Sequence, residues 1–350
     1  EIIGGSTVYR FPVGPAGAMT QADCAGGEVG DEADWCNGVL PVEWDANTVD
    51  SSAEDEGFCA IVDIWGADPG QPPGPNNPPD GVPEVVLITN DPNGAGNADD
   101  EGILQIHVGA TGALLLRQVL PTGRRGGPPN VDDFDGDGFP EIGTAGGTGY
   151  NMIDLQAPTA DCPAWPTAAT GDANEASSVN PPRNVPGGAC TQASDCGDVT
   201  QFECNLATSS CVCLHNGWLR TTEDDSSRVT GSSVFDFNGD GAAEVVYNDE
   251  CRFRIYDGVD AHVGMSEASE SRTRIEYPIV ADVDNDGNAE IVFSTTNESG
   301  FCSENLDAEY NAGLEVWGDQ NDFWLSARRI WNQHAYQVPL VTEDGRIPLS

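Results

Sequence analysis

Short apolar runs separated by turn residues make up most of this chain. Typical runs are Val85-Val-Leu-Ile88, Ile103-Leu-Gln-Ile-His-Val108, Phe253-Arg-Ile-Tyr256 and Ile291-Val-Phe293. Runs of this length that are rich in β-branched and aromatic residues, with glycine, proline, asparagine and aspartate between them, are typical of strands joined by tight turns. No convincing amphipathic helix longer than about three turns is found. The pattern predicts an all-β protein.

Acidic residues alternate directly before one of these predicted strands. Asp282, Asp284 and Asp286 lie on alternate residues, and Gly287 and Glu290 come after them. Three oxygens on alternate residues of a tight loop converge on one point, and a glycine permits the positive φ that turns the backbone around that point. Two like charges about 4 Å apart repel by roughly 4 kcal/mol in a partly buried site, so the cluster indicates a bound cation. All-oxygen ligation favours Ca²⁺, with Mg²⁺ or Mn²⁺ as alternatives.

The loop differs from an EF-hand in the residues after its acids. An EF-hand needs a bidentate glutamate at its twelfth position and a helix on each side. Here the twelfth position is Phe293, inside a predicted strand. The sequence therefore predicts a calcium loop that is flanked by strands.

The same nine-residue frame occurs three times in regular form. The pattern D-x-[DN]-x-D-G-x-x-E followed by an apolar run spans residues 133–141, 236–244 and 282–290. Three coincidences of a frame this specific are improbable even in an acidic chain, so we interpret them as an internal repeat.

Two further copies are incomplete. Asp63 is separated from Asp80 and Glu84 by an insertion over residues 66–79 that is rich in Pro, Gly and Asn, and this copy lacks the third-position acid. The chain itself begins with Glu1-Ile-Ile, which matches the end of a frame. We therefore expect the natural polypeptide to extend further towards the N-terminus, or this chain to be a processed or partial piece.

The spacing of the frames predicts repeated four-stranded units. Glu244 and Glu290 are 46 residues apart, which fits one antiparallel unit with tight turns. The wider spacings contain insertions, the largest over residues 157–216. It opens rich in proline and then places five of the eleven cysteines between Cys190 and Cys213. A disulfide-stapled excursion explains this density, with a zinc site as the alternative.

Cysteine usage and charge bound the class of protein. Eleven cysteines favour disulfides and an oxidising compartment, and we expect the chain to be secreted or on the cell surface. The odd number leaves one thiol free, paired with another chain or paired with a cysteine elsewhere, and a bond between Cys24 and Cys36 is plausible. The net charge is −44 and no lysine is present, so nucleic acid is an improbable partner. The high negative charge has two explanations: it provides solubility and cation binding, or it is an adaptation to a high-salt habitat. No membrane span is expected.

These frames resemble the FG-GAP/VCBS repeat, which occurs in the β-propeller of integrin α subunits and in large secreted bacterial proteins. The resemblance implies a single β-propeller over residues 1–350, with four-stranded antiparallel blades that start near residues 1, 60, 130, 233 and 279, Ca-binding loops between strands, and the disulfide-rich insertion 157–216. It implies three Ca²⁺ sites with side-chain ligands at positions one, three, five and nine and a backbone carbonyl at position seven. The implied ligands are Asp133, Asp135, Asp137, Phe139, Glu141, Asp236, Asn238, Asp240, Ala242, Glu244, Asp282, Asp284, Asp286, Asn288 and Glu290, with weaker candidates Asp63, Asp80 and Glu84 in a fourth site.

The segment 328–336, which contains Trp331, is similar to a segment near the end of some bacterial propellers of this type. It has two interpretations. Its aromatic side chains either pack the last blade or form a ligand-binding groove.

Catalytic patterns are lacking in the sequence. None of the four histidines lies beside a serine or cysteine motif, and no nucleophile elbow, zinc-protease or nucleotide-binding motif occurs. Two hypotheses remain. The first is a non-catalytic extracellular Ca-stabilised propeller for adhesion or structural assembly, binding protein or glycan at the surface or forming a homo-oligomer, layer or filament. The second is a secreted propeller that binds or cleaves polysaccharides, as related scaffolds do.

Overall fold

The computed structural model describes residues 2–4, 7–9, 13–14, 17–18, 42–45, 55–91, 101–120, 125–156, 189–192, 195, 202–205, 209–213, 217–224, 229–271, 276–296, 302, 312–331, 341–342 and 346. Within these ranges the regular elements are β-strands and no α-helix occurs. The strands are β1 Ile2–Gly4, β2 Thr7–Tyr9, β3 Val13–Gly14, β4 Gly17–Ala18, β5 Val42–Asp45, β6 Asp55–Val62, β7 Glu84–Asp91, β8 Glu101–Val108, β9 Leu114–Val119, β10 Asn130–Asp132, β11 Glu141–Gly146, β12 Gly149–Ile153, β13 Phe202–Asn205, β14 Ser210–Cys213, β15 Trp218–Thr221, β16 Ser232–Phe235, β17 Glu244–Asn248, β18 Arg252–Tyr256, β19 Val263–Ala268, β20 Ile279–Ala281, β21 Glu290–Thr295 and β22 Gly313–Gly318. The predicted all-β class is confirmed.

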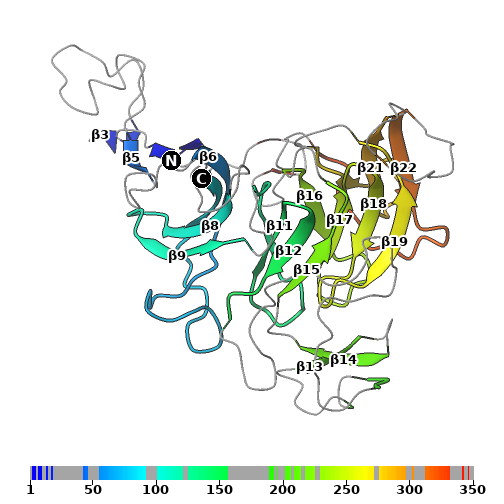
Figure 1. Ribbon diagram of the computed structural model, residues 1–350, viewed down its shortest axis with the longest axis horizontal. Coiled ribbons are helices and arrows are strands. Elements are labelled where there is room, and N and C mark those ends of the chain that lie inside the picture. The colour runs from blue at the N-terminus through cyan, green and yellow to red at the C-terminus, as the bar shows by residue number, and fades with distance from the viewer. Residues whose placement is uncertain are drawn as a thin grey trace.

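Four antiparallel sheets succeed one another along the chain, and in each the strands pair in sequence order. The first sheet is β6-β7-β8-β9, the second β10-β11-β12-β15, the third β16-β17-β18-β19 and the fourth β20-β21-β22. Figure 1 shows them side by side in this order. Smaller sheets are β1-β2-β5, β3-β4 and β13-β14. The predicted four-stranded antiparallel unit is therefore present three times, and the fourth sheet has three strands in the described residues.

Apolar clusters fill the spaces between neighbouring sheets. The central strands read as continuous apolar runs because both of their faces are buried. In β17, Val245 and Tyr247 pack towards the second sheet and Val246 packs towards the fourth. The cluster between the first and second sheets includes Ile64, Val86, Ile88, Leu104, Ile106, Ile142 and Ile153; that between the second and third includes Tyr150, Met152, Trp218, Val245, Tyr247 and Tyr256; and that between the third and fourth includes Val246, Phe253, Val280, Ile291 and Phe293.

The first strands of the four sheets lie next to one another. Strand β10 contacts β6 and β16, and β16 contacts β20. These strands line a cavity of about 610 Å³. The first strand of each of these four sheets therefore faces a common cavity.

Charged groups are buried next to the third sheet. The Arg254 side chain is fully buried, and it donates to Asp249 through Nη1 and to Glu223 Oε2 through Nη2, the latter at 3.3 Å. Burial acts to lower the pKa of Arg254, but the charges of Asp249, Tyr256 and Glu223 and the hydrogen bond to Asp249 together outweigh it, so the pKa is raised. A buried pair of this kind is costly to break because one charge is then left without compensation.

A disulfide joins the third and fourth sheets. Cys251 precedes β18, and it is bonded to Cys302, 51 residues later, with a Cα–Cα distance of 5.5 Å. Cys190 is also disulfide-bonded, which favours the disulfide interpretation of the insertion over zinc at this cysteine. Cys59 carries a free thiol. The predicted pairing of Cys24 with Cys36 lies outside the described residues.

The insertion 157–216 is described only in part, and its regular structure there is the hairpin of β13 and β14. Among the described residues, no helix has the length and apolar character needed to cross a membrane.

Candidate metal centres in the strand-connecting loops

The nine-residue frame forms the connection between the first and second strands of a sheet. In loop 133–141, Asp133 accepts hydrogen bonds from the backbone N–H of Gly136 at 2.7 Å and of Gly138 at 2.8 Å. Glu141 Oε2 accepts from the N–H of Phe134 at 2.9 Å. Gly138 has a φ of 90°, which the predicted turn at this glycine requires. The loop is thus folded around the carboxylates at positions one and nine.

The other two regular loops repeat this arrangement. In loop 236–244, Asp236 accepts from two glycine N–H groups, and Glu244 accepts from Phe237 at 2.8 Å. In loop 282–290 the fourth position is Asn285, with a φ of 68°, a left-handed conformation that asparagine tolerates better than most residues. The shared hydrogen bonds explain why the same sequence frame produces the same strand–loop–strand unit.

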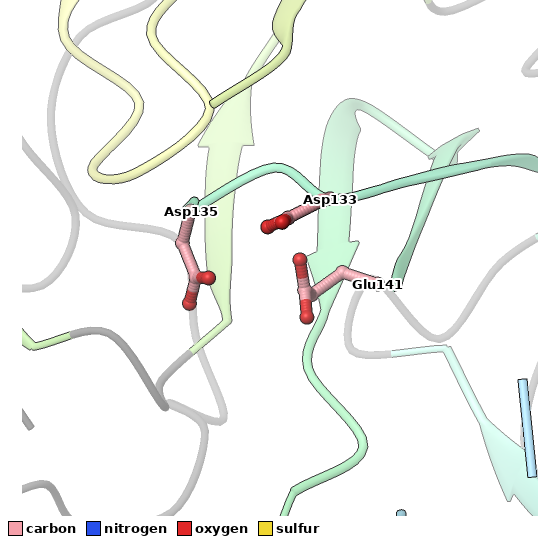
Figure 2. A group of neighbouring side chains, drawn as sticks. All are labelled: Asp133, Asp135 and Glu141. Carbon is pink, nitrogen blue, oxygen red and sulfur yellow. The ribbon is translucent and has the colours of Figure 1, made fainter. Parts of the chain in front are cut away.

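Loop 133–141 gathers three carboxylates into a buried cluster. Asp133, Asp135 and Glu141 each offer a carboxylate oxygen, and these oxygens lie within 4.8 Å of one another. Figure 2 shows the side chains turned towards one another, with Glu141 at the start of β11. Asp135 is 1% exposed and Glu141 is 0% exposed. This cluster could hold a metal ion.

Two carboxylate oxygens of this cluster lack a hydrogen-bond donor among the described residues. Oδ2 of Asp135 and Oε1 of Glu141 are buried and have no hydrogen-bond partner among the described residues. Burial, followed by the charge of neighbouring carboxylates, raises the pKa of Asp135 and of Glu141 well above their ordinary values. A buried carboxylate oxygen without a donor is unfavourable, and a cation placed between these oxygens removes the cost.

The fifth-position acid of this loop lies outside the three-residue cluster. Asp137 Oδ1 accepts from the N–H of Phe139 at 2.8 Å, and its Oδ2 accepts from the side-chain amide of Gln156. The structure thus places Asp137 in the loop as predicted but engages both of its oxygens. The position-seven carbonyls, Phe139 here and Ala242 and Asn288 in the other loops, remain predictions.

Loop 282–290 forms the second cluster. Asp282, Asp284 and Glu290 bring carboxylate oxygens within 4.8 Å of one another. Asp282 and Glu290 are buried, whereas Asp284 is exposed. Burial and the charges of Asp284 and Asp286 raise the pKa of Glu290. The site has the same acidic composition as loop 133–141 but is more open to water.

Loop 236–244 is closed by an amide. Asn238 Nδ2 donates to Asp240 Oδ2 at 2.9 Å and to Glu244 Oε1 at 3.1 Å. Burial, with the charges of Asp240 and Asp257, raises the pKa of Glu244 to about 8. The predicted ligands are gathered here, but a cation would have to displace the two hydrogen bonds of Asn238.

The interrupted copy keeps the frame without its metal cluster. Asp63 accepts from the N–H of Asp80 at 3.1 Å and of Gly81 at 2.7 Å, across the insertion. Glu84 Oε2 accepts from Ile64 at 3.1 Å. These are the contacts made by positions one and nine of the regular loops. No metal-binding group is found at this loop in the described residues, consistent with its missing third-position acid.

Sequence reasoning missed the acid that comes directly after the third strand of three of the four sheets; in the fourth sheet it is Asp319, after β22. Asp154 comes directly after β12, and Asp257 comes directly after β18. The charge of Asp154 contributes to raising the pKa of Asp135 and Glu141. The sequence signal that could have identified these acids is an aspartate directly after the third predicted strand of a repeat unit.

The central cavity receives part of the segment 328–336. Arg328, Ile330 and Trp331 line the cavity together with Tyr277 and Cys59. Burial raises the pKa of the Cys59 thiol. The described end of the segment therefore faces a space large enough for a ligand, and residues 332–336 lie outside the described residues.

His107 is buried, and both of its ring nitrogens are engaged. Nδ1 lies 2.9 Å from the carbonyl oxygen of Gly112, and Nε2 lies 2.9 Å from Gln105 Oε1. These contacts fix the ring between β8 and the next turn, so His107 has a structural role there.

Comparison with known proteins gives one weak likeness. No family model matches the chain, and no curated protein matches it. Among solved structures, the chain is similar to the crystal structure of the V. cholerae biofilm matrix protein Bap1, at 15% identity and a TM-score of 0.35, over 85% of this chain and 74% of that chain. Agreement at this level does not show a shared fold.

Proposed function

We propose that this chain is a non-catalytic, extracellular β-propeller that is stabilised by Ca²⁺ and serves adhesion or structural assembly. The observation that carries the proposal is the repetition of one unit. Antiparallel sheets follow one another in chain order, and the same acidic loop connects the first and second strands of successive sheets. Face-to-face packing between successive sheets and a central space lined by their first strands support blades arranged around an axis. In this proposal residues 1–350 form one propeller and residues 157–216 are an insertion in it.

Calcium is the ion that best suits the candidate centres. All the side chains concerned offer oxygen, and Ca²⁺ accepts six to eight oxygen ligands in flexible geometry. The buried Oδ2 of Asp135 and Oε1 of Glu141, which have no hydrogen-bond partner among the described residues, support occupancy of loop 133–141 by a cation. We propose the full loop ligand sets for sites in loops 133–141, 236–244 and 282–290, with the interrupted copy as a weaker candidate.

Secretion is supported by the covalent bond between Cys251 and Cys302, because structural disulfides persist mainly in oxidising compartments. A surface for association is supported by the fourth sheet. Leu314 and Val316 on β22, and Phe323 just beyond it, are exposed by 75%, 55% and 77%. In the described residues β22 is the last strand of its sheet, and exposed apolar side chains along such a strand are a feature of surfaces that pair with another chain.

Calcium removal tests the metal part of the proposal. Each site filled to 100 times its dissociation constant stabilises the fold by about 2.7 kcal/mol, so excess Ca²⁺ should raise the melting temperature relative to EDTA. A thermal transition that EDTA leaves unmoved would refute calcium binding.

Assembly is tested on purified protein by sedimentation and electron microscopy in Ca²⁺. We expect oligomers or filaments that the double variant Leu314→Lys, Phe323→Lys weakens. Val119→Lys is the matched control, since Val119 is also exposed on an edge strand, β9, but of the first sheet. Dispersed monomers at high concentration with Ca²⁺ would refute the assembly role.

Polysaccharide binding or cleavage is the second candidate, and the central cavity is the observation in its favour. Tyr277, Arg328 and Trp331 line it, and they provide two aromatic rings and a guanidinium suited to stacking on a sugar and pairing with its carboxylate. Glycan-array binding and an activity screen on acidic polysaccharides test this candidate. Loss of binding in Trp331→Ala would place it in the cavity, and silence in both assays would remove it.

A further inference from the structure

Asp154 lies opposite Glu141 of loop 133–141 in the register of β11 and β12. Strands β11 and β12 are antiparallel, and Ile142 pairs with Ile153. The next residue outward on each strand is Glu141 on β11 and Asp154 after β12, so the register brings these two residues face to face. An acid placed after the third strand is thus delivered to a loop that joins the first two strands.

The turn after β12 is attached to the loop by further contacts. Asp154 Oδ1 accepts from the backbone N–H of Gln156 at 2.7 Å, which closes the turn, and Gln156 in turn donates its side-chain amide to Asp137 Oδ2. The other oxygen of Asp154, Oδ2, is buried. One oxygen of Asp154 therefore shapes the turn, while the second is buried.

The loop itself does not satisfy the buried oxygens. Oδ2 of Asp135 and Oε1 of Glu141 are buried without a hydrogen-bond partner among the described residues. A third carboxylate beside two that lack hydrogen-bond donors destabilises the metal-free site by charge repulsion. A cation bound among the three would offset that repulsion.

We propose that Asp154 is an additional ligand of the cation in loop 133–141, which gives this site a fifth carboxylate and ties β10, β11 and β12 to one ion. The inference rests on the proposed calcium binding. Ca²⁺ affinity rises with the number of charged ligands and with the rigidity of the site, so we expect this to be the tightest of the three candidate sites.

The fourth sheet offers a matched contrast. Asp319 also comes after a third strand, β22, but Glu290 pairs with Gly318, so Asp319 lies one residue further along. Oδ2 of Asp319 accepts from two backbone N–H groups of its own turn, at 2.8 and 3.0 Å. Asp154 and Asp319 therefore both follow a third strand, and both accept hydrogen bonds that close the next turn. Only Asp154 lies opposite the glutamate at the ninth position of its loop.

Asparagine substitutions separate the ligand role from the turn role. In Asp154→Asn the side-chain oxygen still accepts the hydrogen bond from Gln156, but the charge is lost. Calcium binding is measured by isothermal titration calorimetry on the parent, Asp154→Asn and Asp319→Asn. We expect Asp154→Asn to weaken the tightest class of site by about tenfold or more and Asp319→Asn to leave it unchanged.

Melting in EDTA provides the second readout. If Asp154 repels Asp135 and Glu141 in the metal-free protein, Asp154→Asn melts at a higher temperature than the parent in EDTA and gains less from Ca²⁺. Unchanged calcium affinity in Asp154→Asn, or a lower melting temperature in EDTA, would overturn the ligand role and leave calcium binding by the loops intact. A parent protein that binds no Ca²⁺ would overturn both.

Discussion

The metal-free protein should lose stability as the pH rises, and Glu244 provides the clearest measure of this effect. Burial, followed by the charges of Asp240 and Asp257, raises the pKa of Glu244 from 4.5 to about 8, although a hydrogen bond from Phe237 acts in the opposite direction. Because the folded pKa lies above that of the unfolded chain, the contribution of Glu244 is fully present below pH 4.5 and is lost as the pH rises through about 8.

The size of the effect is set by the shift. The rise in pKa from 4.5 to about 8 costs the metal-free fold roughly 3 kcal/mol at pH 7, where Glu244 is still mostly protonated in the folded protein, and roughly 5 kcal/mol once its ionisation is complete. Unfolding entropy is about 2.1 cal/mol/K per residue, so for 350 residues the cost at pH 7 corresponds to roughly 4 °C of melting temperature.

The assay is thermal unfolding in EDTA between pH 5 and 8 at fixed ionic strength, for the parent, Glu244→Gln and Glu267→Gln. Glutamine keeps the acceptor for the Phe237 N–H but carries no charge. Glu267, exposed on β19 of the same sheet, controls for the change in net charge. We expect Glu244→Gln to have a shallower decline than the parent and Glu267→Gln to behave as the parent does. Equal slopes in the parent and Glu244→Gln would refute the reasoning.

Three further predictions concern the loops and the buried framework. Asp249→Ala removes one of the two carboxylates that pair with the buried Arg254, so the free energy of unfolding measured in urea should fall by about 3–5 kcal/mol. A fall below about 1 kcal/mol would contradict this. Replacing Cys251 and Cys302 by alanine should cost about 4 kcal/mol, because the bond closes a loop of 51 residues; a stability equal to that of the parent would count against it. Asn238→Asp removes the bridging amide and adds a charge, so it should lower stability in EDTA and raise calcium affinity in calorimetric titration, whereas unchanged affinity would argue that loop 236–244 does not bind the ion.

The strand–loop–strand unit could be predicted from sequence because its determining contacts are local. Asp133 bonds to Gly138 and Glu141 bonds to Phe134, all within nine residues. The same contacts made the interrupted copy recognisable, since Asp63 reaches Gly81 across the insertion. A frame of hydrogen bonds between fixed positions leaves a fixed spacing in the sequence, and insertions between its two halves do not change the residues that meet.

Contacts between separate strands and sheets do not impose a fixed spacing on the sequence. The approach of Asp154 to Glu141 depends on the register of β11 and β12, and the bond between Cys251 and Cys302 depends on how the third and fourth sheets pack. The cavity lined by Trp331 combines four strands from distant parts of the chain. The first depends on strand pairing within one sheet, and the other two result from the packing of preformed sheets, which is decided by the summed shape of many side chains.

The third position of the frame explains why equivalent loops differ as metal centres. In loop 133–141 it is Asp135, which is buried and has an oxygen without a donor among the described residues, so a cation bound there would remove the largest cost. In loop 282–290 it is Asp284, which is exposed and retains water as a partner. In loop 236–244 it is Asn238, whose amide already satisfies two carboxylates. One side chain, through its charge and burial, thus sets the order in which the three loops should fill with calcium: 133–141 first, 282–290 second and 236–244 last.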